Sequence, residues 1–114
     1  MSLYEVKERI VLCMELDREV RIQLSQFYKM FADETRIRIL LLLEASKRNV
    51  NEIAEALNMT QSSISHQLQT LRLNNFVRHE KIGKEVYYSL ADDHIKIILE
   101  YGLEHIKEEM DATI

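Results

Sequence analysis

The sequence predicts a mainly α-helical fold that carries one small β-hairpin. The 114 residues include no proline and two glycines, and these residue types interrupt helices most strongly. Two short helical patterns joined by a tight turn lie in the middle of the chain, and two short alternating segments follow them. With 46% hydrophobic and 30% charged residues, the chain is typical of one globular domain, which we expect to span residues 1–114.

Composition argues against a membrane or secreted protein. The longest apolar run, 39–43, is far shorter than a membrane span. Residues 1–14 carry charged side chains where a signal peptide needs an apolar centre. We therefore expect a cytoplasmic protein. Cys13 is the one cysteine, which excludes an intrachain disulfide and a thiolate-rich zinc site within one chain.

Helical spacing of apolar residues predicts helices at both ends of the chain. The pattern over 1–31 indicates one long or two short helices, with Asp17 as a possible cap, and the pattern over 92–110 indicates one last helix. Terminal helices are surplus to a core of this size, so we expect both segments to form the interface of a homodimer. Between them, Asp33 is a predicted N-cap for a helix over 34–44, which is apolar nearly all round and therefore central.

The stretch NVNEIAEALNMTQSSISHQLQTLRLNNFV has the spacing of a helix-turn-helix, which we assign to 50–72. A short helix is predicted over 51–57, and a tight connection over 58–60 leads to a second helix capped by Thr60. Ala54 is small, which lets the two helices approach closely. The second helix is expected to bury Ile64, Leu68 and Leu71.

The opposite face of this second helix is polar without being acidic. Hydroxyl, amide and imidazole groups can donate to and accept from base edges and phosphates without filling the groove. A merely solvated helix more often carries glutamate and lysine on such a face. We therefore predict contacts to double-stranded DNA from Gln61, Ser62, Ser63, Ser65, His66 and Gln69.

A basic β-hairpin, or wing, is predicted over 76–90, with Ile82 and Gly83 near the tip of its turn. Lys81 and Lys84 flank that tip, where they could reach phosphates or the adjacent minor groove. The alternative is that these lysines protect an edge strand against aggregation.

Charge is divided unevenly along the chain, whose formal net charge is −4. From Thr60 to Val86, four basic residues stand against two acidic ones, giving +2, and this is the only clearly basic section. From Tyr87 to the end, two lysines stand against seven acidic residues, giving −5. The middle of the chain thus favours a polyanion, and the last helix favours a cation.

Four side chains of the last helix have spacings that favour a metal site. His94 and His105 share one helix face, yet they lie roughly 16 Å apart along it. Donors to one ion must lie within about 4 Å of one another. An antiparallel second copy would bring its His105 and Glu108 beside Asp92 and His94 of the first, and the two-fold axis would generate an equivalent second site. Taken singly, each of these residues is more often a cap, a buried polar spacer or a solvated charge.

The run FADETRIRILLLL, the helix-turn-helix and the wing RHEKIGKEVYYSL together resemble the ArsR/SmtB family of metal-sensing winged-helix repressors, over residues 17–110. The segment SSISHQLQTLR carries the most specific part of the resemblance. The stretch at 50–57 lacks the cysteine motif of members that bind metal there, so we expect no thiolate site for arsenite, cadmium or lead at that place. The members that sense zinc through the C-terminal helix share a D-x-H and H-x-x-[HE] pattern, which is matched here by Asp92, His94, His105 and Glu108.

The resemblance implies a winged helix-turn-helix repressor that binds a two-fold symmetric operator as a metal-free homodimer. It further implies that Zn(II) releases the DNA and that the regulated genes serve metal efflux or sequestration. Two nitrogen and two oxygen ligands suit tetrahedral Zn(II), and Co(II) would also fit. The resemblance also suggests an allosteric link. In it, the ring nitrogen of His105 that does not bind metal hydrogen-bonds toward the second helix of the helix-turn-helix, near His66.

Two other functions are compatible with parts of the sequence. A winged helix could act as a metal-independent DNA-binding or protein-interaction regulator, with the four ligands an accident. A mononuclear metallohydrolase could use the same ligands, but it needs an open coordination position and a general base, and the sequence offers no remaining group for that role. We therefore expect no enzymatic activity.

Overall fold

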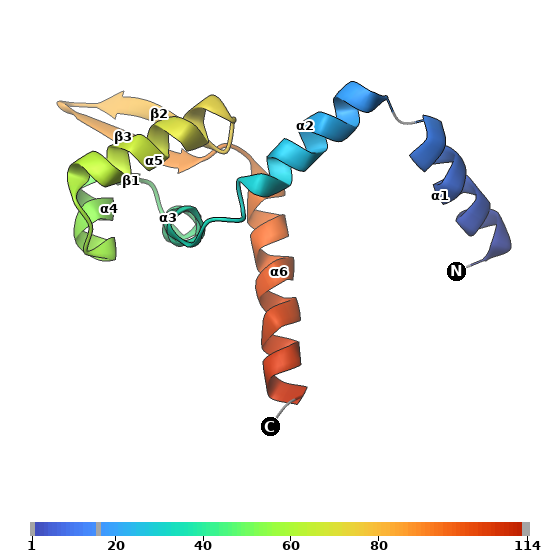
Figure 1. Ribbon diagram of the computed structural model, residues 1–114. Coiled ribbons are helices and arrows are strands. Elements are labelled where there is room, and N and C mark those ends of the chain that lie inside the picture. Colours follow the sequence, from blue (N-terminus) through green and yellow to red (C-terminus); the bar gives the residue numbers. More distant parts are fainter. Residues whose placement is uncertain (1, 16, 113–114) are drawn as a thin grey trace. The chain divides into compact units, whose positions relative to one another are not determined.

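The computed structural model describes residues 2–15 and 17–112, except for the side chains of residues 13–15. Contacts divide the chain into two units, Met1–Phe31 and Ala32–Ile114, and each is described by itself. Figure 1 labels the helices and strands. In the parts of the chain so described, no helix combines the length and apolarity that crossing a membrane requires.

The first unit contains two short helices, α1 (Leu3–Glu15) and α2 (Arg18–Lys29), which settles the choice between one long and two short helices. Asp17 occupies the N-cap position of α2, but its side chain makes no capping hydrogen bond, so the expected cap contact is not formed. The end of α2 carries edge-to-face aromatic contacts, with ring centroids 5.2 Å apart for Phe27 and Tyr28. The Cys13 side chain lies outside the described residues.

The second unit is built around α3 (Glu34–Ala45). This helix packs against α4 (Val50–Leu57), α5 (Gln61–Leu73) and β3 (Glu85–Leu90). The predicted cap is confirmed, because the Arg36 amide donates to the Asp33 carboxylate at 2.9 Å. The helix is apolar on more sides than the unit covers, since Leu41 is 38% exposed. Its buried residues are Ile39, Leu40 and Leu43.

The helix-turn-helix is confirmed as α4 (Val50–Leu57) followed by α5 (Gln61–Leu73). A capping box starts α4: the Glu52 amide donates to the Asn49 side chain at 2.8 Å, and the Asn49 amide donates to the Glu52 carboxylate at 3.0 Å. Asn58 ends α4 with a left-handed φ of 55°, a conformation that asparagine tolerates better than most residues. The second helix buries the three predicted residues, Ile64, Leu68 and Leu71.

The wing belongs to a three-stranded antiparallel sheet in the order β1-β3-β2. Its strands β2 (Val77–Ile82) and β3 (Glu85–Leu90) form the predicted hairpin. The sequence did not predict β1 (Arg48–Asn49), because two residues are too few to show alternation. The expected tip shifts by one residue: Ile82 pairs with Glu85 in the ladder, and Gly83, with a φ of 64°, begins the turn.

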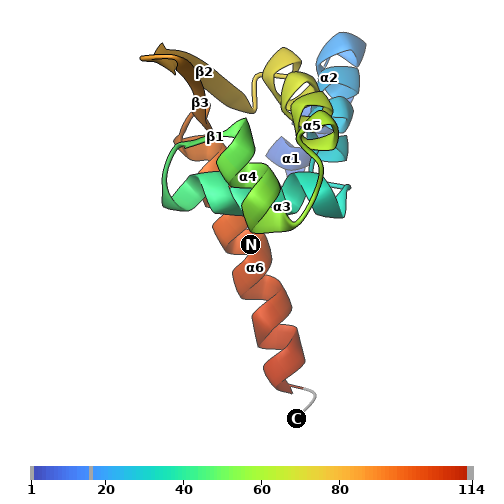
Figure 2. The same ribbon diagram turned by 90° about the vertical axis from the view of Figure 1, so that its left-hand side faces the viewer.

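The last helix, α6 (Asp93–Ala112), follows β3 and is offset from the predicted 92–110 by one residue at its start and two at its end. Only its first half packs on the unit, where Ile95 and Leu99 are buried. Every described residue from Tyr101 onward is exposed. In both views, the end of α6 extends away from the helix-turn-helix and the wing (Figures 1 and 2).

Candidate nucleic-acid interface and metal ligands

The polar face predicted on α5 is largely open to solvent. Apolar packing on one side of the helix fixes which residues point outward, because side chains three and four positions apart share a face. Ser63 is half-buried. The other predicted DNA contacts on this helix are exposed, namely Gln61, Ser62, Ser65, His66 and Gln69.

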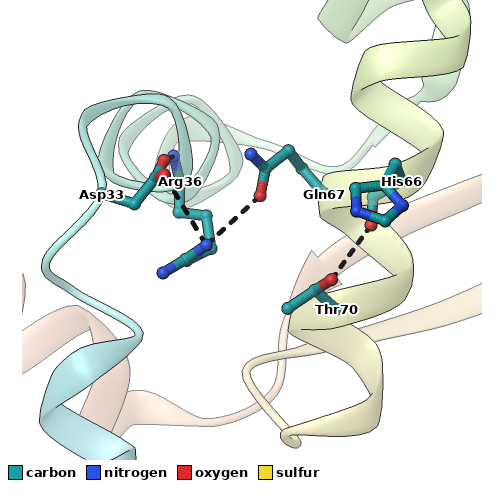
Figure 3. A network of polar contacts seen from close by, with 5 residues as sticks. All are labelled: Asp33, Arg36, His66, Gln67 and Thr70. Carbon is teal, nitrogen blue, oxygen red and sulfur yellow. Dashed lines mark hydrogen bonds and ion pairs between the residues drawn. The ribbon is translucent and has the colours of Figure 1, made fainter.

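Local hydrogen bonds restrain part of this face. The Ser63 amide donates to the Thr60 hydroxyl at 3.1 Å, which confirms the predicted cap. The side-chain nitrogen Nε2 of Gln61 donates to the side-chain oxygen of Asn51 at 2.8 Å, so this predicted base contact also links α5 to α4. The Thr70 hydroxyl donates to the backbone carbonyl of His66 at 3.2 Å, leaving the His66 ring to solvent (Figure 3).

The wing presents both predicted lysines. Lys81 is the fifth residue of β2 and Lys84 lies in the turn itself, and both are exposed. The strand that carries Lys81 is an edge strand of the sheet, so protection of that edge remains an alternative role. Farther from the tip, Glu80 forms an ion pair with Lys47 at 3.3 Å, and both side chains are more than half exposed.

At the start of α6, Asp92 and His94 lie together. The Asp92 carboxylate accepts hydrogen bonds from the amides of His94 and Ile95 at 2.9 and 3.3 Å, as an N-cap does. Its Oδ1 lies 3.5 Å from Nδ1 of His94. Partial burial raises the pKa of the Asp92 carboxyl, but the two amides and the His94 ring outweigh that effect, so the pKa lies below its ordinary value. Asp92 is therefore an ionised oxygen donor beside an imidazole.

The second predicted pair, His105 and Glu108, lies in the exposed half of α6. Nε2 of His105 is 3.3 Å from the carboxylate of Glu109, one turn further along the helix. Glu109 was not among the predicted ligands, although its spacing of four residues from a histidine is a signal that the sequence displays.

The structure does not bring the two pairs together within one chain. Among the residues that the structure describes, no three His, Cys, Asp or Glu side chains converge on a point that could hold a metal ion. Each pair taken alone offers one imidazole nitrogen and carboxylate oxygen, the donor types that Zn(II) accepts. The donor types therefore fit the ion, and within the described part of one chain the four predicted ligands stand as two separate pairs.

The predicted link between His66 and His105 is likewise not made by the contacts described within one chain. His66 is joined to Thr70 through its carbonyl, and His105 to Glu109.

One contact that the sequence did not predict joins α3 to α5. The guanidinium of Arg36 donates to the side chain of Gln67 at 3.5 Å, although the two residues are 31 positions apart. Nothing in the spacing of either residue signals this pairing, because it depends on the crossing of two helices.

Comparison with known proteins gives consistent results. A family model described as bacterial regulatory protein, arsR family, matches residues 33–79. The chain is 34% identical over 86 residues to the transcriptional repressor SmtB homolog of Synechocystis sp., a match that covers 75% of this chain and 65% of that protein. It is 33% identical over 90 residues to the HTH-type transcriptional regulator NmtR of Mycobacterium tuberculosis, a match that covers 79% of this chain and 75% of that protein.

Among solved structures, the chain is similar to a homodimeric winged helix-turn-helix DNA-binding domain from Mycobacterium bovis, described as a possible ArsR-family regulator. The TM-score is 0.78 at 26% identity, and the match covers 86% of this chain and 93% of that one. The family model, the relatives above 30% identity and this winged helix agree on one group. The chain therefore belongs to the arsR family of bacterial regulatory proteins, which are DNA-binding transcription regulators with a winged helix-turn-helix and not enzymes.

Proposed function

We propose that the protein is a metal-responsive repressor that binds operator DNA as a metal-free homodimer and is released by Zn(II), or by Co(II), at two sites shared between subunits. The observation that carries the proposal is the arrangement of α6. It bears two exposed donor pairs, Asp92 with His94 and His105 with Glu108, which are too far apart for one chain to close on an ion.

A second copy of α6 is the partner that would complete these sites. In an antiparallel pair of helices, each His105–Glu108 pair lies beside the Asp92–His94 pair of the other chain, and two-fold symmetry makes two equal sites. Zn(II), when bound, would supply a tetrahedral cross-link between the two subunits.

The surface of α6 also supports dimerisation. The face of α6 that carries His94 and His105 also carries Ile97 and Tyr101, which are 46% and 69% exposed. Exposed apolar side chains on this face favour a second copy packed against it, and the similar domain from Mycobacterium bovis is described as homodimeric.

DNA binding would use the exposed face of α5 in the major groove and the wing beside it. Two recognition helices related by a two-fold axis would read a two-fold symmetric operator. Lys81 and Lys84 would neutralise phosphates next to the sites that α5 reads. Because it would act on operator DNA, we propose that the protein acts in the cytoplasm, on genes for metal efflux or sequestration.

Coupling between the two kinds of site requires that the metal favour a dimer geometry in which the recognition helices no longer fit successive major grooves. The proposed route runs from His105 toward the backbone near His66. The His66 carbonyl accepts from Thr70, and a carbonyl oxygen has a second lone pair that could accept from an imidazole N–H.

The test is a titration of protein bound to DNA. A fluorescent duplex is first selected from a random library with protein that has been treated with chelator. Zn(II), Co(II), Ni(II) and Cd(II) are then added separately while anisotropy reports release. We expect Zn(II) and Co(II) to lower affinity by roughly 5- to 150-fold, the usual range of allosteric coupling. Ni(II) should act less well, since it prefers more ligands or a square geometry.

Two results would contradict the proposal in different ways. If no metal releases the DNA and equilibrium dialysis detects no bound zinc at micromolar concentration, the protein is a metal-independent regulator. If zinc binds without releasing DNA, the metal site stands and its regulatory role falls.

A further inference from the structure

Arg36 lies in the first turn of α3, and both its backbone amide and its guanidinium contact Asp33. Its amide donates to Asp33 at 2.9 Å, and its guanidinium lies 3.7 Å from the other carboxylate oxygen of Asp33. The side chain is only 19% exposed. The same Nη1 atom donates to the Gln67 side-chain oxygen at 3.5 Å (Figure 3). Arg36 thus links α3 to α5.

Gln67 borders the side of α5 that faces the core, as the half-buried polar residues Ser63 and Thr70 also do. It is half-buried, and the buried residues of α5 are all apolar: Ile64, Leu68 and Leu71. Apolar packing is non-directional and tolerates small rotations of a helix about its axis. A hydrogen bond has a preferred direction, so it restrains such a rotation. The Arg36–Gln67 contact is therefore suited to set how far α5 is rolled toward or away from the DNA.

The rotation of α5 about its axis would set the positions of the exposed side chains near Gln67. His66 is exposed and immediately precedes it, and Ser65 and Gln69 lie on the outer face within two positions. A rotation of α5 by even a few degrees moves these side chains relative to base edges. The reading of bases depends on such geometry, whereas attraction to phosphates does not.

We infer that Arg36 is a positioning residue for sequence recognition: by holding Gln67, it sets the roll of α5 and hence the fit of the recognition face to the bases. The inference rests on the proposed DNA binding through α5. It assigns specificity to a residue that need not touch DNA.

A neighbouring arginine provides a matched comparison. Arg38, two positions further along α3, donates to the backbone carbonyl of Leu57 at 3.0 Å, at the end of α4. Removing its charge changes the protein's net charge by the same amount, but leaves the contact to Gln67 in place.

The experiment compares affinities for two duplexes, one selected from a random library by the wild-type dimer and one of the same composition with scrambled sequence. The single variants are Arg36→Gln, Arg36→Lys, Gln67→Ala and Arg38→Gln. The double variants combine Gln67→Ala with Arg36→Gln or with Arg38→Gln. Circular dichroism and dimer mass establish that each is folded. Affinities are measured over a series of salt concentrations.

We expect Arg36→Gln and Gln67→Ala each to lower the ratio of selected to scrambled affinity on the order of threefold to tenfold, as loss of one hydrogen bond would. Scrambled-DNA affinity and the salt slope should stay unchanged. The double variant should be no worse than either single one, because both remove the same contact. Arg36→Lys should lower the ratio less than Arg36→Gln does, since an ammonium can still donate one hydrogen bond to the Gln67 oxygen. Arg38→Gln combined with Gln67→Ala should instead be additive.

Several outcomes would overturn the inference. A fall in both affinities together, with a salt slope smaller by about one per protomer, would make Arg36 a phosphate contact. Additive effects of Arg36→Gln and Gln67→Ala, or an unchanged ratio, would each show that the contact does not set recognition. If the wild-type dimer enriches no sequence at all, the proposed function fails together with the inference. The outcomes above differ from this result, because in each of them the wild-type dimer still selects a sequence.

Discussion

At the scale of single residues, Asp92 combines a structural role with a proposed functional one. Its carboxylate caps α6 through the amides of His94 and Ile95, and the same carboxylate is a proposed metal ligand. Asparagine caps a helix about as well as aspartate does, but it carries no charge for the ion. The two roles can therefore be separated by substitution.

The first prediction concerns this separation. Asp92→Asn should leave the thermal stability of the metal-free dimer nearly unchanged and weaken Zn(II) binding at least tenfold. Asp92→Ala should weaken zinc binding similarly and also lower stability, because the side chain no longer supplies a capping acceptor. Calorimetric unfolding without metal and competition with a zinc indicator provide the two readings. Normal zinc affinity in Asp92→Asn would leave the residue with a capping role alone.

A second residue-scale prediction concerns base reading. The double variant Ser65→Ala with His66→Ala should abolish preference for the selected duplex while the dimer stays folded, because both side chains are exposed and make no core contact. Fluorescence anisotropy with selected and scrambled duplexes measures the preference. Intact preference would mean that α5 does not read bases through these positions.

At the scale of elements, the wing and the junction of α3 with α6 each depend on charge. For the wing, substituting Lys81→Gln and Lys84→Gln should make the dependence of log affinity on log salt shallower by about 0.9 for each phosphate that the variant no longer neutralises. Lys96→Gln with Lys107→Gln removes equal charge from α6 and should leave the slope nearly unchanged. If the wing lysines only protect an edge strand, the slope will not change and the variant will aggregate more readily.

At the junction, burial raises the pKa of Glu44 on α3, as do its hydrogen bond to Glu100 on α6 and the charge of Glu100, while Lys96 opposes them. The folded pKa lies above the ordinary value of 4.5, so the folded state binds the proton more tightly. The stability this provides is complete below the ordinary pKa and is lost as pH rises through the folded pKa.

Glu44→Gln, which cannot ionise, should consequently raise the melting temperature at pH 7 by on the order of 1–3 °C and bring no gain near pH 4. Glu104→Gln, at an exposed glutamate of the same helix as Glu100, is the control and should show no such pH dependence. Scanning calorimetry at the two pH values measures the change in melting temperature. An equal change at both pH values would show that protonation of the Glu44–Glu100 pair is not linked to folding.

At the scale of the whole molecule, the proposed sites exist only in an assembly. This permits a complementation test with two variants that should each fail to bind zinc as a homodimer. His94→Ala removes a ligand from one half of each site, and His105→Ala removes a ligand from the other half. In a mixed dimer the two lesions fall in the same site, so the other site keeps all four ligands. Mixing the two proteins should restore about one zinc per heterodimer, measured by metal analysis after gel filtration.

The matched control is a mixture of His94→Ala with Asp92→Ala. Both changes lie in the same half-site, so every site in the mixed dimer is incomplete and no zinc should be retained. Recovery of zinc in this control, or none in the first mixture, would show that the ligands do not meet across an antiparallel pair of α6 helices.

Much of the fold was determined by the sequence itself, for local physical reasons. The periodic apolar residues of α5, the caps at Asp33 and Thr60, and the paired strands of the wing all depend on neighbours within a few positions. The four proposed ligands were also named from spacing and from family resemblance, since ligands on one helix have positions that the helical repeat fixes.

Only the tertiary structure decided what depends on segments distant along the chain. The strand β1 forms because β3 offers it a free edge, and Arg36 meets Gln67 because α3 crosses α5. The structure also established that α6 leaves the core after Leu99, so that His105 and Glu108 are exposed beyond it. The local sequence pattern cannot predict these contacts, because they depend on how helices and strands that are distant along the chain pack against one another.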